Sequence, residues 1–158
     1  MNEKLRVFVS SVQKELEDER LIIQNLLVTD AFLSVQCSPV LYELEPASPS
    51  RALEGCIEAL DTCQVYLLIV GIEYGTRVDD LSITHTEYRR AKDLGLPVLA
   101  FIKGGRGVER EAGTREFLAE LDADGPKYKR FGNVIELQRE VRAALVKLLS
   151  DDHGISPT

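Results

Sequence analysis

Cysteine and histidine are scarce in this chain of 158 residues, which contains three cysteines and two histidines. The cysteines, Cys37, Cys56 and Cys63, form no CxxC pair, and neither histidine lies at metal-ligand spacing from them. An odd number of cysteines without such a pair is typical of a reducing compartment and argues against a zinc site. We therefore expect a cytoplasmic protein with no bound metal and no resident cofactor.

Several other signatures are missing. The chain has neither the GxGxxG fingerprint of dinucleotide-binding folds nor the GxxxxGK[ST] of a P-loop. Its net charge of −7 argues against a nucleic-acid partner, because phosphate neutralisation needs a concentrated basic face. The longest apolar run, near residues 65–70, is too short to cross a bilayer, and no charged leader precedes a secretory segment, so no membrane partner is expected. Acidic chains still bind small anions through local cations, so the net charge does not exclude nucleotides as ligands.

The chain does contain alternating strand and helix patterns. Leu5–Ser10 is a short strand pattern, and helical spacing follows from Val12 to Leu27. Gln64–Val70 is the most continuous apolar run, which is typical of a strand covered on both faces of a parallel sheet. The other expected elements are a strand within residues 34–46 limited by Pro39 and Pro46, a helix capped by Ser48, a helix that ends at Gly95, a strand at 97–102, a helix at 114–123, an edge strand within 130–137 and a helix at 138–150. This alternation predicts an α/β fold with a five-stranded, mostly parallel sheet and Gln64–Val70 near its centre.

Ligands of such sheets bind beyond the carboxyl ends of the strands, where the strand order reverses. Three loops of this chain would meet there, namely the loop that begins at Ser10 and Ser11, the loop at 71–82 and the segment after Ile102. The two serine hydroxyls and the amides beside them are suited to a phosphate group, and equally to capping of the helix that follows.

The loop after the central strand carries further candidates. Gly71 and Gly75 are turn glycines in the stretch GIEYG, and Tyr74 between them is suited either to stacking on a base or to covering the sheet edge. Arg77 is the cation of this loop, and it suits a phosphate or an ion pair with the acidic residues that follow it.

Two charged side chains are ambiguous in the sequence. Arg20 is four residues after Leu16, so it is either a surface partner of Glu17 or a partly buried guanidinium that ties its helix to a loop. His85 has no catalytic partner at a recognisable spacing, and we expect it at the surface.

The role of Glu87, in the stretch LSITHTEYRRAKDLG, decides between an enzyme and a binding module. Thr84 and Glu87 have the spacing of a capping box, in which the two side chains satisfy amides at a helix start. If Ser82 caps the helix instead, Glu87 lies a full turn inside and can project toward a pocket. The pattern leaves both interpretations open.

Four stretches occur in a recognisable order: RVFVSSVQKELEDER, YLLIVGIEYG, SITHTEYRRAKDLGLPVLAFI and a closing F..VIELQREV. Together they resemble a TIR-like domain-of-unknown-function family over nearly the whole chain, from Arg6 to about Leu149. The resemblance implies a flavodoxin-like (TIR-like) three-layer fold at the N-terminus of larger bacterial and animal proteins. It also implies a domain at residues 1–150, with 151–158 as a tail or the start of a linker to a missing C-terminal region.

That family is similar to TIR domains and nucleoside deoxyribosyltransferases, which cleave N-glycosidic bonds, and in TIR domains activity typically needs neighbouring protomers. In those relatives a glutamate early in the helix after the central strands is catalytic, and Glu87 matches it, with Ser82 as the small polar residue ahead of it. The chain departs from TIR pockets in having no tryptophan, so pocket aromatics would have to be Phe8, Tyr74 or Tyr88. The resemblance and the loops together give Glu87 as the catalytic candidate and, as substrate-binding candidates, Ser10, Ser11, Gly71, Tyr74, Gly75, Arg77 and Ser82.

The implied reaction is cleavage of a nucleotide, with NAD as the favoured substrate, in a self-associating defence or signalling module. The nicotinamide of NAD leaves as a neutral molecule from a cationic ring, so no general acid is required. One carboxylate that stabilises an oxocarbenium-like transition state is sufficient, unlike the paired carboxylates of ordinary glycosidases. The alternative is a non-catalytic module for homotypic interaction or nucleotide sensing.

Overall fold

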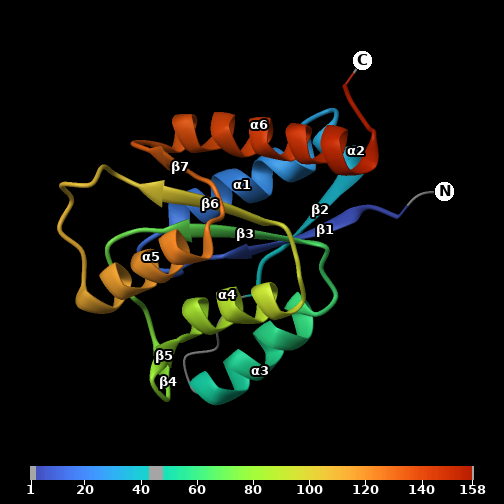
Figure 1. Ribbon diagram of the computed structural model, residues 1–158. Coiled ribbons are helices and arrows are strands. Elements are labelled where there is room, and N and C mark those ends of the chain that lie inside the picture. Colours follow the sequence, from blue (N-terminus) through green and yellow to red (C-terminus); the bar gives the residue numbers. More distant parts are fainter. Residues whose placement is uncertain (1–2, 43–47, 158) are drawn as a thin grey trace.

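The computed structural model describes residues 3–42 and 48–157. Its centre is a sheet of five parallel strands, and Figure 1 shows helices on both faces. The strands are β1 Leu5–Ser10, β2 Cys37–Val40, β3 Val65–Val70, β6 Val98–Lys103 and β7 Tyr128–Phe131, in the spatial order β2-β1-β3-β6-β7. This flavodoxin-like three-layer arrangement confirms the predicted fold and the central place of the Gln64–Val70 segment.

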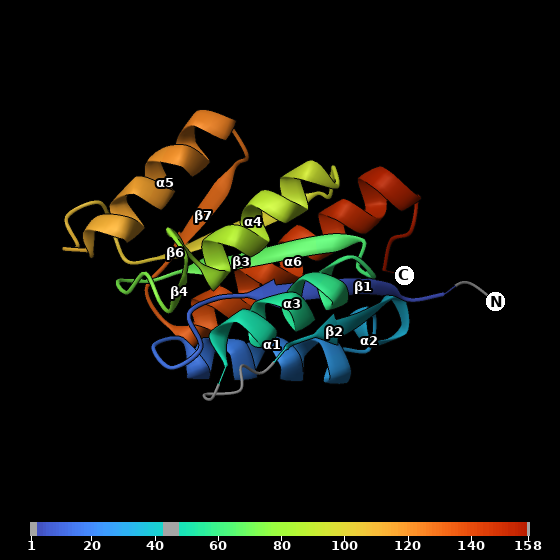
Figure 2. The same cartoon turned by 90° about the horizontal axis from the view of Figure 1, so that it is seen from below.

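The helices divide between the two faces of the sheet, as Figures 1 and 2 show. On one face lie α1 Glu17–Thr29, the short α2 Leu33–Gln36 and α6 Val134–His153; on the other lie α3 Pro49–Leu60, α4 Ile83–Asp93 and α5 Ala112–Asp124. Each layer has its own cluster of buried apolar side chains. In the described part of the chain, no helix has both the length and the apolar character needed to cross a membrane.

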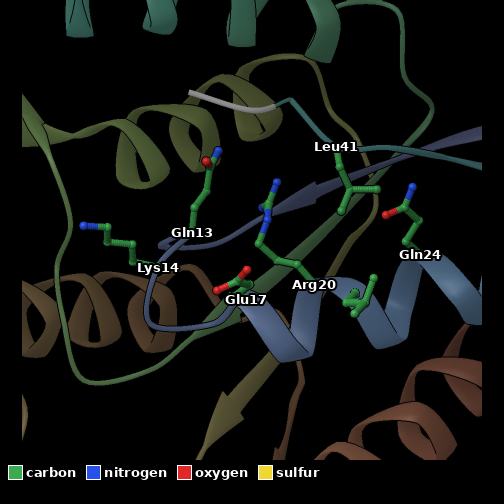
Figure 3. Close-up of a pocket in the computed structure, with 7 residues that line it drawn as sticks. Gln13, Lys14, Glu17, Arg20, Gln24 and Leu41 are labelled. Carbon is green, nitrogen blue, oxygen red and sulfur yellow. The ribbon is translucent and has the colours of Figure 1, made fainter. Parts of the chain in front are cut away.

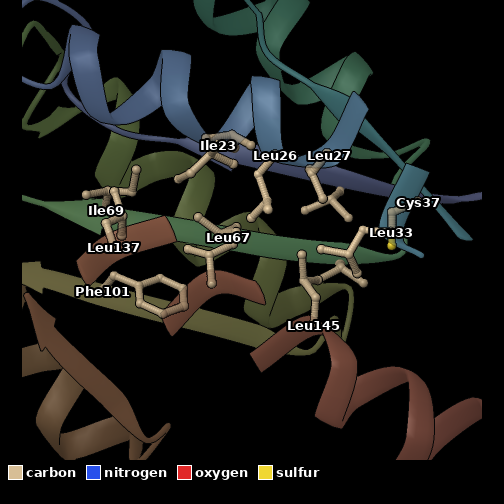
Figure 4. Close-up of a cluster of buried hydrophobic side chains, with 14 of the residues drawn as sticks. Ile23, Leu26, Leu27, Leu33, Cys37, Leu67, Ile69, Phe101, Leu137 and Leu145 are labelled. Carbon is tan, nitrogen blue, oxygen red and sulfur yellow. The ribbon is translucent and has the colours of Figure 1, made fainter. Parts of the chain in front are cut away.

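β3 is buried over its whole length because its alternate residues face different layers. Leu67 and Ile69 belong to the core with α1 and α6, and Figure 4 shows Leu67 between Leu26 of α1 and Leu145 of α6. Tyr66 and its alternate neighbours belong to the core beneath α3, α4 and α5. A strand with two apolar faces therefore explains the longest apolar run of the sequence.

The helix expected from Val12 begins only at Glu17, because residues 13–16 form a turn. Side chains in this turn contact other loops: Gln13 Nε2 donates to the Tyr42 carbonyl at 2.7 Å, and Glu15 contacts the loop after β3. The helical spacing expected for this segment still agrees with the structure, since Leu16, Ile23, Leu26 and Leu27 are all buried.

The second strand is shorter than the stretch 34–46 suggested. β2 covers Cys37–Val40 only, and α2 occupies residues that we expected to be extended. Pro39 lies within β2, which is acceptable because β2 is an edge strand. Pro46, expected to limit this strand, lies outside the described residues. Ser48 precedes α3 as predicted, but its side chain makes no capping hydrogen bond within the described residues.

The last elements also differ from the prediction. β7 includes only Arg130 and Phe131 of the expected edge-strand stretch 130–137. Asn133 caps α6, because its side-chain oxygen accepts a hydrogen bond from the Glu136 amide at 2.9 Å. α6 therefore starts four residues earlier than expected, at Val134, and continues to His153.

Candidate functional site

The loops after β1, β3 and β6 meet at the carboxyl edge of the sheet, as predicted. Glu15, in the first loop, accepts hydrogen bonds from the amides of Ile72 and Glu73 in the second, at 2.7 and 3.0 Å. Arg110, in the third, donates from Nη1 to the Gly71 carbonyl at 2.7 Å. Since the strand order reverses between β1 and β3, these contacts surround the switch point at which ligands of this fold bind.

A hollow of about 560 Å³ lies among these loops and is called here the switch-point hollow. Its lining residues are Ser11, Val12, Gln13, Lys14, Glu73, Gly75, Thr76, Ile83, Thr84 and Glu111. Hydroxyl groups, one lysine and two glutamates therefore offer both donors and acceptors to a polar ligand. Of the substrate-binding candidates, only Ser11 and Gly75 line this hollow.

A second hollow of about 560 Å³ lies beside α1 and shares Gln13 and Lys14 with the first. Figure 3 shows Arg20 extending from α1 among the residues that line it. Arg20 is 5% exposed, and its Nη1 donates to the Val9 carbonyl at 3.3 Å and to Ser11 Oγ at 3.2 Å. Arg20 is thus the buried guanidinium that ties its helix to a loop, and the alternative of a surface partner is wrong.

Ser82, rather than Thr84, caps α4. Its Oγ accepts a hydrogen bond from the His85 amide at 3.1 Å, and its backbone is extended, with φ −68° and ψ 158°. The capping box of Thr84 with Glu87 is therefore excluded. Because α4 starts at Ile83, Glu87 lies in its second turn, where its side chain is available for another role.

Replacement of Ser82 by alanine should lower the free energy of unfolding by about 1 kcal/mol, because it removes this cap. Thr84→Val, which keeps the side-chain shape and removes the hydroxyl, should change it by less than half as much. Urea denaturation of the two variants and the wild type tests this assignment. A larger loss for Thr84→Val than for Ser82→Ala would contradict it.

The Glu87 carboxylate lies at the end of β1, beneath the loops. Its Oε1 accepts a hydrogen bond from Ser10 Oγ at 2.6 Å, and the residue is 5% exposed. The Cys56 thiol of α3 also interacts with this carboxyl group and lowers its pKa. Ser10, expected to bind substrate, thus holds the catalytic candidate in place. Thr84, one turn before Glu87 on α4, lines the switch-point hollow, whereas Glu87 does not.

Burial raises the pKa of Glu87 to about 7, because the charged carboxylate loses its hydration. The hydrogen bonds from Ser10 and Cys56 and the positive charge of Arg20 oppose this increase. The Glu87 charge in turn raises the pKa of Tyr66, although burial is the larger cause. Glu87 is therefore a carboxyl group that changes charge near neutral pH.

Two of the three expected pocket aromatics, Phe8 and Tyr88, pack with Tyr66, which was not expected, whereas Tyr74 contacts His85 instead. Tyr66 of β3 stacks on Phe8 with ring centroids 6.2 Å apart, and the tilted ring of Tyr88 has its centroid 6.3 Å from that of Tyr66. All three rings are buried and none lines the switch-point hollow. Tyr66 was missed because it lies inside an apolar run, where an aromatic residue predicts core packing.

Tyr74 and His85 belong to a separate buried network. Tyr74 Oη lies 2.6 Å from His85 Nδ1, and His85 Nε2 lies 3.0 Å from Glu120 Oε1 of α5. The ring of Phe117 stacks on His85 at 4.1 Å. His85 is 4% exposed, so the expectation of a surface histidine is wrong. This network joins the loop after β3 to α4 and α5.

Arg77 packs against Tyr74, with its guanidinium carbon 4.5 Å from the ring centroid, and its Nη1 donates to the Asp80 carbonyl at 2.6 Å. It belongs to a short antiparallel pair, β4 Arg77–Val78 and β5 Leu81–Ser82, which the sequence did not indicate. Gly75 has φ +90°, a conformation that requires glycine, and it places the chain beside Val12.

The described residues contain no group of three or more histidine, cysteine, aspartate and glutamate side chains arranged to hold a metal ion. Fold and site together define a flavodoxin-like α/β domain with a polar hollow at its switch point and a buried glutamate beneath it. The chain belongs to the family described as a domain of unknown function (DUF4062), whose model matches residues 6–146. No curated protein matches the chain.

Proposed function

We propose that this domain binds a nucleotide in the switch-point hollow and that Glu87 promotes cleavage of its N-glycosidic bond, with NAD as substrate. The module would be TIR-like and act in defence or signalling. The observation that carries the proposal is the position of Glu87. Its carboxylate lies at the strand-order reversal, one helical turn below Thr84 of the hollow, with a pKa near the operating pH.

The proposed reaction breaks the bond between nicotinamide and C1′ of the ribose. The bonding electrons leave with the nicotinamide nitrogen, which becomes neutral, and positive charge develops on the sugar. A charged Glu87 stabilises that charge and accepts hydrogen bonds from the ribose hydroxyls in place of Ser10. Water then attacks C1′ and releases its proton to solvent, and the products are nicotinamide and ADP-ribose.

Binding has to open the packing around Ser10, because Glu87 is 5% exposed in the free domain. In TIR domains, which the sequence resembles, neighbouring protomers order the pocket. We therefore include self-association through this domain in the proposal. Cleavage per domain would then depend on protein concentration.

The purified domain, incubated with NAD over a range of protein concentrations, should release nicotinamide. The rate per domain should increase with concentration, and chromatography of the products together with sedimentation of the same samples measures both. Failure to release nicotinamide at any concentration at which the domain self-associates would contradict the proposal.

The burial of Glu87 specifically favours a second function, a non-catalytic nucleotide-sensing or homotypic interaction module. Here the Ser10–Glu87 hydrogen bond would remain intact and the hollow alone would take the ligand. Nucleotide binding without nicotinamide release identifies this function.

A further inference from the structure

Three consecutive backbone amides after β3 point at carboxylates from distant parts of the chain. The amides of Ile72 and Glu73 donate to Glu15 Oε2 and Oε1. The next amide, that of Tyr74, donates to Glu111 Oε1 at 3.0 Å. Consecutive amides at the end of a strand form an anion-binding concavity. In this structure two internal carboxylates occupy it, Glu15 at the first two amides and Glu111 at the third.

Gly71 makes room for the Glu15 carboxylate. A Cβ atom on Gly71 would lie 2.6 Å from both carboxylate oxygens of Glu15, which is closer than real Cβ contacts. Its φ lies outside the left-handed region, so the requirement for glycine here is the space that the carboxylate fills. The backbone therefore leaves a cradle beside the two amides.

A buried cation lies at the same place. Arg110 is 7% exposed, and its guanidinium donates to the carbonyls of Gly71 and Lys103, both at 2.7 Å. Burial lowers the pKa of Arg110 and the charge of Arg130 lowers it further, whereas the negative charge of Glu15 raises it. An anion in the cradle thus supports a guanidinium that is otherwise poorly solvated.

The cradle also adjoins the switch-point hollow. Glu73, whose amide contacts Glu15, lines that hollow, and so does Lys14, the neighbour of Glu15 in sequence. A ligand in the hollow would therefore reach the cradle without crossing the core. A phosphate group matches the Glu15 carboxylate in having a negative charge and several acceptor oxygens.

We propose that the Ile72 and Glu73 amides, Gly71 and Arg110 form the phosphate subsite of the switch-point hollow, and that Glu15 closes it in the free domain. The ligand class, a nucleotide with a terminal or bridging phosphate, rests on the proposed function. Phosphate and the Glu15 carboxylate compete for the same two amides, so Glu15 sets the phosphate concentration at which the hollow fills.

The test is titration of ¹⁵N-labelled domain with inorganic phosphate and with AMP, with the Ile72 and Glu73 amide resonances as the readout. Glu15→Ala should bind phosphate at least tenfold more tightly than the wild type, and Glu15→Gln should lie between them. Asp18→Ala is the matched control, because it removes the same charge from an exposed position nearby and should behave as the wild type.

The double variant Glu15→Ala/Gly71→Ala places a methyl group in the vacated cradle and should lose the gained phosphate binding. Phosphate responses at these amides that are no larger in Glu15→Ala and Glu15→Gln than in Asp18→Ala would overturn the proposal. If Glu15→Ala does not fold, Glu15→Gln against Asp18→Ala decides alone. Nicotinamide release is a separate measurement, so an inactive domain whose Glu15 variants gain phosphate binding contradicts the proposed reaction and supports this subsite.

Discussion

Glu87→Gln should lower NAD turnover at least a hundredfold. Glutamine keeps the size of the side chain and an oxygen that accepts from Ser10, but it removes the negative charge. Removal of one preorganised group that stabilises transition-state charge typically costs a factor of about 10²–10³ in rate. The loss should appear in kcat, because the charge on the ribose develops only in the transition state.

The pH dependence of the wild-type rate is an independent test of the catalytic role of Glu87. Only the charged carboxylate is effective, so kcat/KM should rise with pH through the Glu87 pKa of about 7. Glu116→Gln, the same chemical change at an exposed position of α5, is the matched control and should retain both the rate and its pH profile. Equal turnover by Glu87→Gln and Glu116→Gln would remove Glu87 from the catalytic role.

The sequence predicted the parts of the molecule whose signals are local. The apolar run at 64–70 identified the central strand, and the turn glycines after it identified one of the loops that surround the switch point. The capping pattern before Glu87 limited its position to two alternatives, and the Ser82 cap in the structure decided between them. In each case the residues that decide the structure lie within one or two turns of one another.

Contacts between distant segments could not be predicted in this way. Glu15 reads as one more acidic residue of a helix, yet its hydrogen-bond partners are 57 and 58 residues away. The contact of His85 with Glu120 could not be predicted either, because Glu120 lies 35 residues further along the chain. The loops after β1 and β3 were expected to meet, but single-segment patterns do not show which side chains of two loops, or of two helices such as α4 and α5, contact each other.

The buried carboxyl of Glu87 connects function with stability. Proteins keep buried ionisable groups at functional sites although these groups reduce stability, and replacement by a neutral residue of the same shape often restores it. In this chain the same substitution that removes the proposed catalytic charge also removes a buried titrating group. Above neutral pH, Glu87→Gln should therefore lower the rate of cleavage but leave the stability of the fold unchanged or increase it.

The stability difference between the wild type and Glu87→Gln should change by roughly 2–3 kcal/mol between pH 5 and pH 8, since one pKa unit corresponds to about 1.4 kcal/mol. The pKa of Glu87 is about 7 in the folded domain against an ordinary glutamate value of 4.5, so the folded state binds the proton more tightly. The stability that this proton contributes is fully present below pH 4.5 and is lost as pH rises through 7. Wild-type stability should therefore fall relative to the variant over this window.

Urea denaturation of both proteins at pH 5, 6, 7 and 8 measures this difference directly. Every other titrating group is common to the two proteins, so subtraction isolates Glu87 as long as its neighbours keep their positions. At pH 8 the variant should be at least as stable as the wild type, because glutamine has no charge to desolvate and still accepts from Ser10. Parallel pH profiles for the two proteins would mean that Glu87 is hydrated in solution, and the closed packing around Ser10 would then be wrong.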